Sequence, residues 1–283
     1  MLEYDFMQNA FMAATIVGIV AGLVGYFLVL RQQTFAGHAL AHVGFTGATG
    51  AVLIGVTPIW GLVIMTVLAG LGMGMLGERL SQRDVAIGIV LALSLGLGLL
   101  FLHFYTAFAT QATTILFGNV LAVDDSTLWT LLGLGLLSIA ILAIISRPLL
   151  FASLQPELAE AKGVSLRGYS VMFLGIVALA TAECAQIVGV LLVFALMVGP
   201  AAAAQRLVAG IGSGLLLSAA LALFEAWAGI TLAFYTDWPS SFWITTLSAG
   251  IYLCSLIPGL DWTALRVRTA ARPDAAKRPD LAT

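Results

Sequence analysis

The sequence predicts an all-α integral membrane protein, a polytopic bundle of about nine transmembrane helices. Three observations predict it. Apolar residues make up 61% of the chain and charged residues 9%, with a mean hydropathy of +1.06, whereas a soluble domain carries roughly 25% charged residues. The apolar residues form runs of membrane length, and the basic residues fall in alternate loops. Composition thus argues against a soluble domain, and the lack of a sizeable basic patch gives no support for nucleic-acid binding.

The apolar runs long enough to cross a bilayer, about 17–25 residues each, are separated by turns that contain Gly, Pro and Asp. They cover residues 9–30, 34–55, 59–77, 85–105, 126–146, 211–234 and 240–257, with a longer run at 169–206. The first residues carry acidic Glu3 and Asp5, whereas a signal peptide begins with a basic region. We therefore expect the first run to be retained as a span.

The 12 Lys and Arg residues orient the predicted bundle. All of them fall in alternate loops if the N-terminus lies outside, while the other loops carry acidic residues such as Asp124. Arg167 and Arg206 must then share a side, so residues 169–206 should cross twice, with a bend near 186–189.

The same alternation of basic and acidic loops predicts how two further segments lie. Residues 106–122 must not cross, and we expect a short re-entrant or interfacial helix there. Residues 1–258 then form one transmembrane domain. The tail, 259–283, is expected to be cytoplasmic and disordered, because it combines proline with scattered charge.

Two histidines, His38 and His42, lie four residues apart in the second run. Residues so spaced share one face of a helix, where two imidazoles could bind one metal ion together. Polar side chains inside a membrane are costly, which favours a functional role. The pair could equally satisfy each other or nearby carbonyl groups between helices.

Other polar residues also lie within the apolar runs. Glu225 is deep in its run and could be a second metal ligand or pathway residue, or a hydrogen-bonded carboxyl between helices. Glu183 lies near the outer end of its run, where a structural role is favoured. The cysteines, Cys184 and Cys254, form no Cys-x-x-Cys motif, and we expect both to be buried apolar side chains.

The longest charged loop, 147–168, contains a predicted short helix. Pro156 suits the first helical position and Gly163 the position just after the end. Glu157 and Glu160 near the start and Lys162 near the end suit the helix dipole. Such an exposed helix can insert into a partner protein, although an ordinary solvated loop is an equally good interpretation.

Five ordered blocks resemble the permease subunit of zinc and manganese ABC importers, and the likeness spans roughly residues 9–258. One block is Pro-Glu-Leu-Ala-Glu-Ala-Lys-Gly-Val, and it is followed, one span later, by a block that begins with Gln-Ile-Val-Gly-Val-Leu-Leu-Val. The blocks cover residues 84–88, 116–121, 156–164, 186–204 and 235–240.

This resemblance implies a homodimeric permease of the vitamin-B12-importer type in a bacterial inner membrane, N-terminus outside and C-terminus cytoplasmic. It implies a metal-binding protein docking outside and a separate ATPase dimer docking inside. The docking residues implied for the ATPase are Pro156, Glu157, Ala159, Glu160 and Gly163. The sequence contains no Gly-x-x-x-x-Gly-Lys-[Ser/Thr] motif, so the ATPase should be another polypeptide. The chain itself is then no enzyme and binds no permanent cofactor.

The family pattern in the second span is Asp-x-x-x-His, and His42 matches its histidine. His38 stands where the family has aspartate. A second imidazole favours zinc over manganese by ligand softness, while the loss of a negative charge weakens binding of any divalent cation. We therefore expect zinc as the substrate, with manganese or iron as the alternative.

Two other classes of protein remain as alternatives. An ion-coupled secondary metal carrier would also need buried ligands, but no ATPase-docking helix. A membrane metalloprotease would need a general base beside the histidines, and Leu40 and Ala41 between them provide none.

Overall fold

The computed structural model describes residues 3–75, 80–104 and 115–257, and the side chains of these ranges apart from 80–83. The regular elements in these ranges are all helical, as the sequence predicts. They are α1 (Asp5–Leu30), α2 (Thr34–Leu53), α3 (Pro58–Met75), α4 (Leu80–His103), η1 (Val120–Ala122), α6 (Asp125–Leu154), α7 (Pro156–Ala161), α8 (Leu166–Val188), α9 (Val193–Leu207), α10 (Ile211–Thr236) and α11 (Ser240–Ser255).

Six of these helices are long and apolar enough to cross a membrane, and this confirms a multi-pass membrane protein. They are α1, α3, α4, α6, α8 and α10. Helices α2, α9 and α11 also coincide with predicted spans but are not among the six, and α9 and α11 have only 15 and 16 residues. The predicted count of nine crossings therefore stays a prediction.

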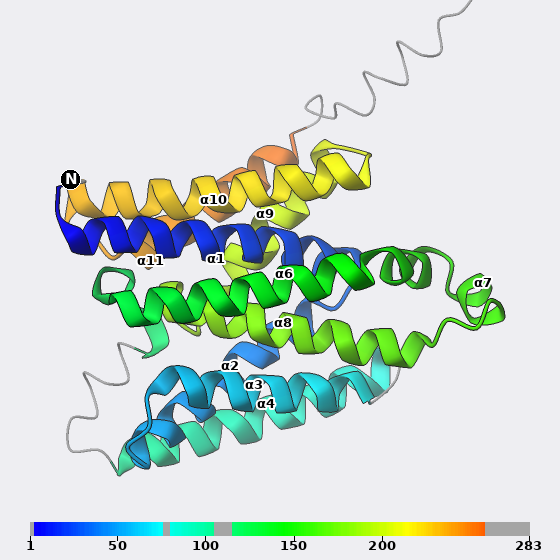
Figure 1. Cartoon of the computed structure of the whole chain (residues 1–283), viewed down its shortest axis with the longest axis horizontal. Coiled ribbons are helices and arrows are strands. Elements are labelled where there is room, and N and C mark those ends of the chain that lie inside the picture. Colours follow the sequence, from blue (N-terminus) through cyan, green and yellow to red (C-terminus); the bar gives the residue numbers. More distant parts are fainter. Residues whose placement is uncertain (1–2, 76–79, 105–114, 258–283) are drawn as a thin grey trace, which may run out of the picture.

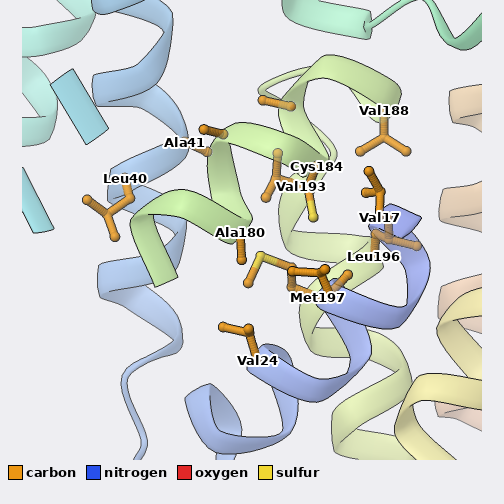
Figure 2. Packing of buried hydrophobic residues seen from close by; sticks show 14 of the residues in the cluster. Val17, Val24, Leu40, Ala41, Ala180, Cys184, Val188, Val193, Leu196 and Met197 are labelled. Atoms are coloured by element: carbon orange, nitrogen blue, oxygen red, sulfur yellow. The ribbon is translucent and has the colours of Figure 1, made fainter. Parts of the chain in front are cut away.

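The helices run side by side as a bundle, with α7 projecting beyond one end (Figure 1). Helices α1 and α8 are central, with 67% and 72% of their most apolar stretch buried, against 22% for α4 at the edge. The core between α1, α2, α8 and α9 is filled by side chains such as Val24, Leu40, Ala180 and Met197 (Figure 2). Hydropathy does not follow this burial, since it is highest, 2.7, in α4 and only 2.3 and 2.0 in α1 and α8.

Several sequence expectations can be compared with these helices. The bend expected near residues 186–189 is confirmed, because α8 ends at Val188 and α9 begins at Val193. The predicted short helix is confirmed as α7, with Pro156 in its first turn and Gly163 at φ 80°.

Other expectations are tested only in part. Of the expected re-entrant helix at 106–122, residues 106–114 lie outside the described residues, and residues 120–122 form the 3-10 turn η1. The expected disordered tail, 259–283, also lies outside them. Cys184 is buried as expected, but Cys254 is exposed, and the prediction for it was wrong. Cys254 lies on α11 at the edge of the bundle, where an apolar residue can face lipid instead of protein.

The start of α6 is fixed by Asp124, which precedes its first helical residue. Its carboxylate accepts a hydrogen bond from the backbone N–H of Thr127 at 3.0 Å and one from the Ser126 hydroxyl at 2.9 Å. These bonds, above all those from Thr127, hold the pKa of the Asp124 carboxyl below its ordinary value. The cap sets where the chain enters the bundle after the η1 turn.

Candidate functional site

The two histidines lie together near the start of α2. This helix begins at Thr34, directly after a turn in which Gln32 has a left-handed backbone, φ 54°. The ring centroids of His38 and His42 are 4.8 Å apart, and the rings meet edge to face at 84°. At this separation both rings can turn a nitrogen towards one ion, as the four-residue spacing predicts.

His42 is the more buried of the two, with 9% of its surface exposed. Its Nδ1 is buried and has no hydrogen-bond partner among the described residues. Buried polar atoms are nearly always paired, so this nitrogen does not behave as a satisfied structural group. His38 is half-buried, and its ring centroid lies 5.8 Å from that of Phe194. An unpaired nitrogen beside a second imidazole could bind a metal ion transiently.

A cavity of about 520 Å³ opens beside His38. It lies between the start of α2, the break between α8 and α9, and parts of α9 and α11; its lining residues are Thr34, Phe35, His38, Leu191, Leu192, Phe194, Ala195 and Thr245. Irregular backbone at membrane depth is tolerated where it lines a cavity, and broken helices mark binding sites in transporters. The sequence predicted the bend but not its position beside the histidines.

The break between α8 and α9 is held by the segment that precedes η1. The N–H groups of Val190 and Leu191 donate to the carbonyl oxygens of Ile115 and Leu116 at 3.3 and 3.2 Å. Gly118 and Gly189 meet there with φ of 73° and 79°. A Cβ on either glycine would collide with the backbone of the opposite segment. Two blocks that resembled the permease family separately in the sequence thus form one contact.

Glu225 lies elsewhere, on the buried side of α10, and is fully buried. Neither of its carboxyl oxygens has a hydrogen-bond partner among the described residues. Ser248 of α11 lies next to this carboxyl, but its hydroxyl donates to the Ala195 carbonyl oxygen at 2.8 Å. In the part of the chain that the structure describes, no group of three or more His, Cys, Asp and Glu side chains gathers into a metal site. Glu225 therefore does not join the histidines in one coordination shell.

A second cavity, of about 400 Å³, links the surroundings of Glu225 to those of His38. It runs between α9 and α11, and it shares Phe194, Ala195 and Thr245 with the first cavity. Ser248, the neighbour of Glu225, also lines it. His38 thus lines the first cavity and Ser248, next to Glu225, lines the adjoining one, an arrangement that sequence spacing could not have shown.

Glu183 is also fully buried, on α8. Its Oε1 accepts a hydrogen bond from the Ser138 hydroxyl of α6 at 3.2 Å, whereas Oε2 has no partner among the described residues. A Cβ added at Gly135 would lie 3.3 Å from that second oxygen, among side chains of α1. This position between α1, α6 and α8 agrees with the structural role favoured for Glu183 by the sequence.

The short helix α7 presents acidic side chains to solvent at the projecting end of the bundle. Glu157 and Glu160 are exposed, while Ala159 between them is fully buried. The N–H of Val164 donates to the Ala159 carbonyl oxygen at 3.0 Å, and the ammonium group of Lys162 lies 5.7 Å from the centroid of the Phe151 ring. The helix is therefore anchored on one side and free for a partner on the other.

Comparison with known proteins identifies the family. The sequence profile of the ABC 3 transport family matches residues 3–259. The chain is 32% identical to the manganese transport system membrane protein MntC of Halalkalibacterium halodurans over 253 residues, which cover 89% of this chain and 87% of that one. It is 30% identical to the manganese import system permease protein ScaB of Streptococcus gordonii over 254 residues, which cover 89% of this chain and 91% of that one.

Solved structures agree with the sequence comparison. The PsaBC structure from Streptococcus pneumoniae, in complex with a Fab, contains a chain that superposes with a TM-score of 0.82 at 28% identity, covering 94% of this chain and 96% of that one. An inward-facing ABC transporter described as of the metal-chelate type gives a TM-score of 0.65 at 21% identity, covering 88% and 85%, and so supports the fold alone. The resemblance read from the five sequence blocks is confirmed, and the chain belongs to the ABC 3 transport family as a membrane permease subunit, not an enzyme.

Proposed function

We propose that this chain is the permease of an ATP-driven importer of divalent metal ions, and that manganese is its substrate. The observation that carries the proposal is the His38–His42 pair beside the cavity at the helix break. Among the residues that the structure describes, no third ligand joins the two imidazoles, and two ligands hold an ion less tightly than a four-ligand structural site does. Weak, transient binding is what a transport pathway needs, because the ion must also leave.

The choice of manganese departs from the zinc expected on ligand softness. Two relatives of comparable length are a manganese transport membrane protein and a manganese import permease. Imidazole suits zinc well, but it also binds manganese. By the Irving–Williams order, almost any nitrogen site binds zinc more tightly than manganese. Selectivity therefore need not follow the affinity of the two histidines. A manganese importer can use a weak site together with an external binding protein that selects the ion.

The ion would pass between two copies of the chain. The two adjoining cavities lie along α9 and α11 and contain small residues, Ala195, Gly199 and Ala202, that let helices approach closely. A second copy on this face would bring its own histidines towards the same passage and add ligands to the ion. The homodimer expected from the sequence would thus complete the coordination shell.

The ATPase would bind at the end of the bundle opposite the N-terminus, where α7 projects (Figure 1). The exposed acidic face of α7, with Glu157 and Glu160, is the proposed contact for a separate ATPase dimer. In this arrangement the chain crosses the inner membrane nine times, with the N-terminus outside and α7 in the cytoplasm. A metal-binding protein would deliver the ion from outside. Membership of an ABC family supports this ATP-driven mechanism over an ion-coupled secondary carrier.

The proposal can be tested in proteoliposomes that contain the chain with its ATPase and external binding protein. We expect uptake of radiolabelled manganese that requires ATP, and slower uptake of radiolabelled zinc under the same conditions. Uptake that persists with a non-hydrolysable ATP analogue would contradict the ATP-driven mechanism. Faster ATP-dependent uptake of zinc than of manganese would show that zinc is the preferred substrate. It would contradict the choice of metal but not the proposed permease function.

A further inference from the structure

Arg31, the first residue after α1, connects three helices through one guanidinium group. Its Nη1 donates to the Ser153 hydroxyl at 2.8 Å, and its Nη2 donates to the Ser170 hydroxyl at 2.8 Å. Its guanidinium carbon also lies 5.5 Å from the centroid of the Phe173 ring. Ser153 belongs to α6, whereas Ser170 and Phe173 belong to α8. The end of α1 is thereby held to both helices at once.

The two helices that Arg31 holds are the ones that flank α7. Ser153 is the residue before the last of α6, and a single residue, Gln155, separates α6 from α7. On the other side, residues 162–165 lead from α7 into α8. The buried Ala159 and the contact of Lys162 with the Phe151 ring fix α7 to these neighbours. We therefore expect a displacement of α7 to be passed to the two hydroxyls that bind Arg31.

On its other side, Arg31 begins the three-residue turn that leads into α2. The N–H of Gln33 donates to the Leu28 carbonyl oxygen at 3.0 Å, and the Gln33 side chain is 7% exposed. A Cβ on Gly37 would lie 2.7 Å from the Leu28 side chain, so the start of α2 packs tightly on the end of α1. Because the turn has only three residues and α2 packs tightly on α1, we expect a movement of Arg31 to shift the beginning of α2. His38 follows in the next turn of that helix.

We propose that Arg31 is the positioning residue through which α7 sets the position of α2 and its two histidines. The inference rests on the proposed function, since it needs an ATPase at α7 and an ion at the histidines. The connected path runs from α7 to Ser153 and Ser170, then to Arg31, and through the 31–33 turn to His38. Each step is a hydrogen bond, a packing contact or a covalent link.

The chemistry of the contact explains why an arginine is needed. Its planar fork presents donors in fixed directions and can hold two hydroxyls while its face stacks on an aromatic ring. A lysine has one compact ammonium group on a flexible stem, so it keeps the charge but not the geometry. From the sequence alone, Arg31 is only one of the basic residues that orient the bundle, and any cationic side chain can fill that role.

The test measures the number of manganese ions transported per ATP hydrolysed by the complete importer in proteoliposomes. This ratio does not depend on how much folded complex is present, so a purely structural loss leaves it unchanged. The variants are Arg31→Met, Arg31→Lys and Ser153→Ala/Ser170→Ala. The matched control is Arg147→Met, since Arg147 is an exposed arginine on α6 near the same end of the bundle.

We expect Arg31→Met to lower the ratio at least about tenfold while the ATPase still copurifies, because each hydrogen bond to a charged group is worth roughly that factor or more. Arg31→Lys should lower it by a smaller factor, and Arg147→Met should leave it at the parental value. In the Ser153→Ala/Ser170→Ala permease, adding Arg31→Met should cause little further change, because contacting residues are not additive.

Four outcomes decide the inference. A parental ratio in Arg31→Met overturns it, and so does an undiminished effect of Arg31→Met in the double serine variant. Loss of ATPase copurification in Arg31→Met would make Arg31 a docking residue instead. If the Arg31→Met permease fails to insert into the membrane, the test is the double serine variant, which keeps the charge of Arg31. A parental ratio of ions transported per ATP in that variant overturns the inference. A parental importer without ATP-dependent uptake would instead overturn the proposed function.

Discussion

The two ends of the proposed transport cycle are built in opposite ways. The His38–His42 pair lies on a buried helix, beside a cavity and a helix break, and it is surrounded by apolar side chains and close backbone contacts. Helix α7 lies outside the bundle and presents Glu157 and Glu160 to solvent, with only Ala159 buried beneath them. The first region depends on shape and on the lack of competing ligands, whereas the second depends on surface charge.

This difference predicts that substitutions in the two regions separate two properties. Changes at α7 should affect association with the ATPase and leave the ion site as it is. Changes near the histidines should affect the ion and leave the ATPase bound. The experiments that follow test this separation, from the largest expected effect to the smallest.

Reversal of charge on α7 should have the largest effect. Glu157→Lys/Glu160→Lys places two cations where the proposed partner meets two carboxylates, and like-charge contacts in an interface oppose association strongly. We expect copurification of the ATPase and manganese uptake to be lost, with the permease still inserted, because both side chains are exposed. The neutral pair Glu157→Gln/Glu160→Gln should retain part of both activities. Normal copurification of the lysine variant would remove α7 as the docking helix.

The glycine contact at the helix break offers the next effect. Gly189→Ala puts a Cβ against the backbone of residues 116–118 at a position with φ 79°, which should cost about 1–3 kcal/mol. We expect a lower midpoint of thermal unfolding and reduced uptake, with ATPase copurification unchanged. Gly133→Ala on α6 is the matched control, since nothing lies within 4 Å of an added Cβ there. Equal stability of the two variants would show that the close contact is not needed.

His38→Asp tests the choice of metal within an otherwise unchanged site. Carboxylate oxygen is a harder ligand than imidazole and adds a negative charge, and both properties favour manganese. We expect uptake to be retained and the ratio of manganese to zinc transport to rise. The measurement is competition between the two ions for uptake. An unchanged ratio would mean that His38 does not contact the ion.

The smallest effect is expected at Glu225. Glu225→Gln keeps the shape of the side chain and removes its ability to carry a negative charge. Because Glu225 is fully buried beside Ser248, which lines the second cavity, and forms no metal-ligand group with the histidines among the described residues, we expect uptake to fall by no more than about threefold, roughly 0.7 kcal/mol. The unfolding midpoint should not fall, since both carboxyl oxygens lack partners among the described residues. A complete loss of uptake would make Glu225 a principal ligand.

Local patterns in the sequence predicted the parts of the molecule that are local. Hydropathy located α1, α3, α4, α6 and α10, the alternation of basic residues divided the 169–206 run where α8 ends and α9 begins, and the proline and glycine signals located α7. The four-residue spacing also brought His38 and His42 together. These features need no knowledge of how the helices pack.

The remaining parts depend on contacts between distant segments, and the sequence could not predict them. The meeting of Gly118 with Gly189, the cavity beside His38 and the contacts of Arg31 each join residues from separate helices. The Leu-Phe-Gly and Ile-Val-Gly blocks were a signal that could have been read further, because glycines in matching irregular segments favour close approach. The burial of Cys254 was wrongly predicted for the same reason, as hydropathy does not tell a lipid-facing position from a protein-facing one.

The most direct test of the account is ATP-dependent uptake of radiolabelled manganese by the His38→Ala/His42→Ala importer, with the amounts of inserted permease and bound ATPase matched to the parent. His103→Ala is the control, because His103 is an exposed histidine at the end of α4. We predict that the double variant loses uptake to background, a fall of at least about a hundredfold, since even residues that only support metal ligands are worth up to that factor. Its ATPase should remain bound, and the His103→Ala importer should transport at the parental rate. Parental uptake by the double variant would contradict the account and show that the ion crosses the membrane without the two histidines.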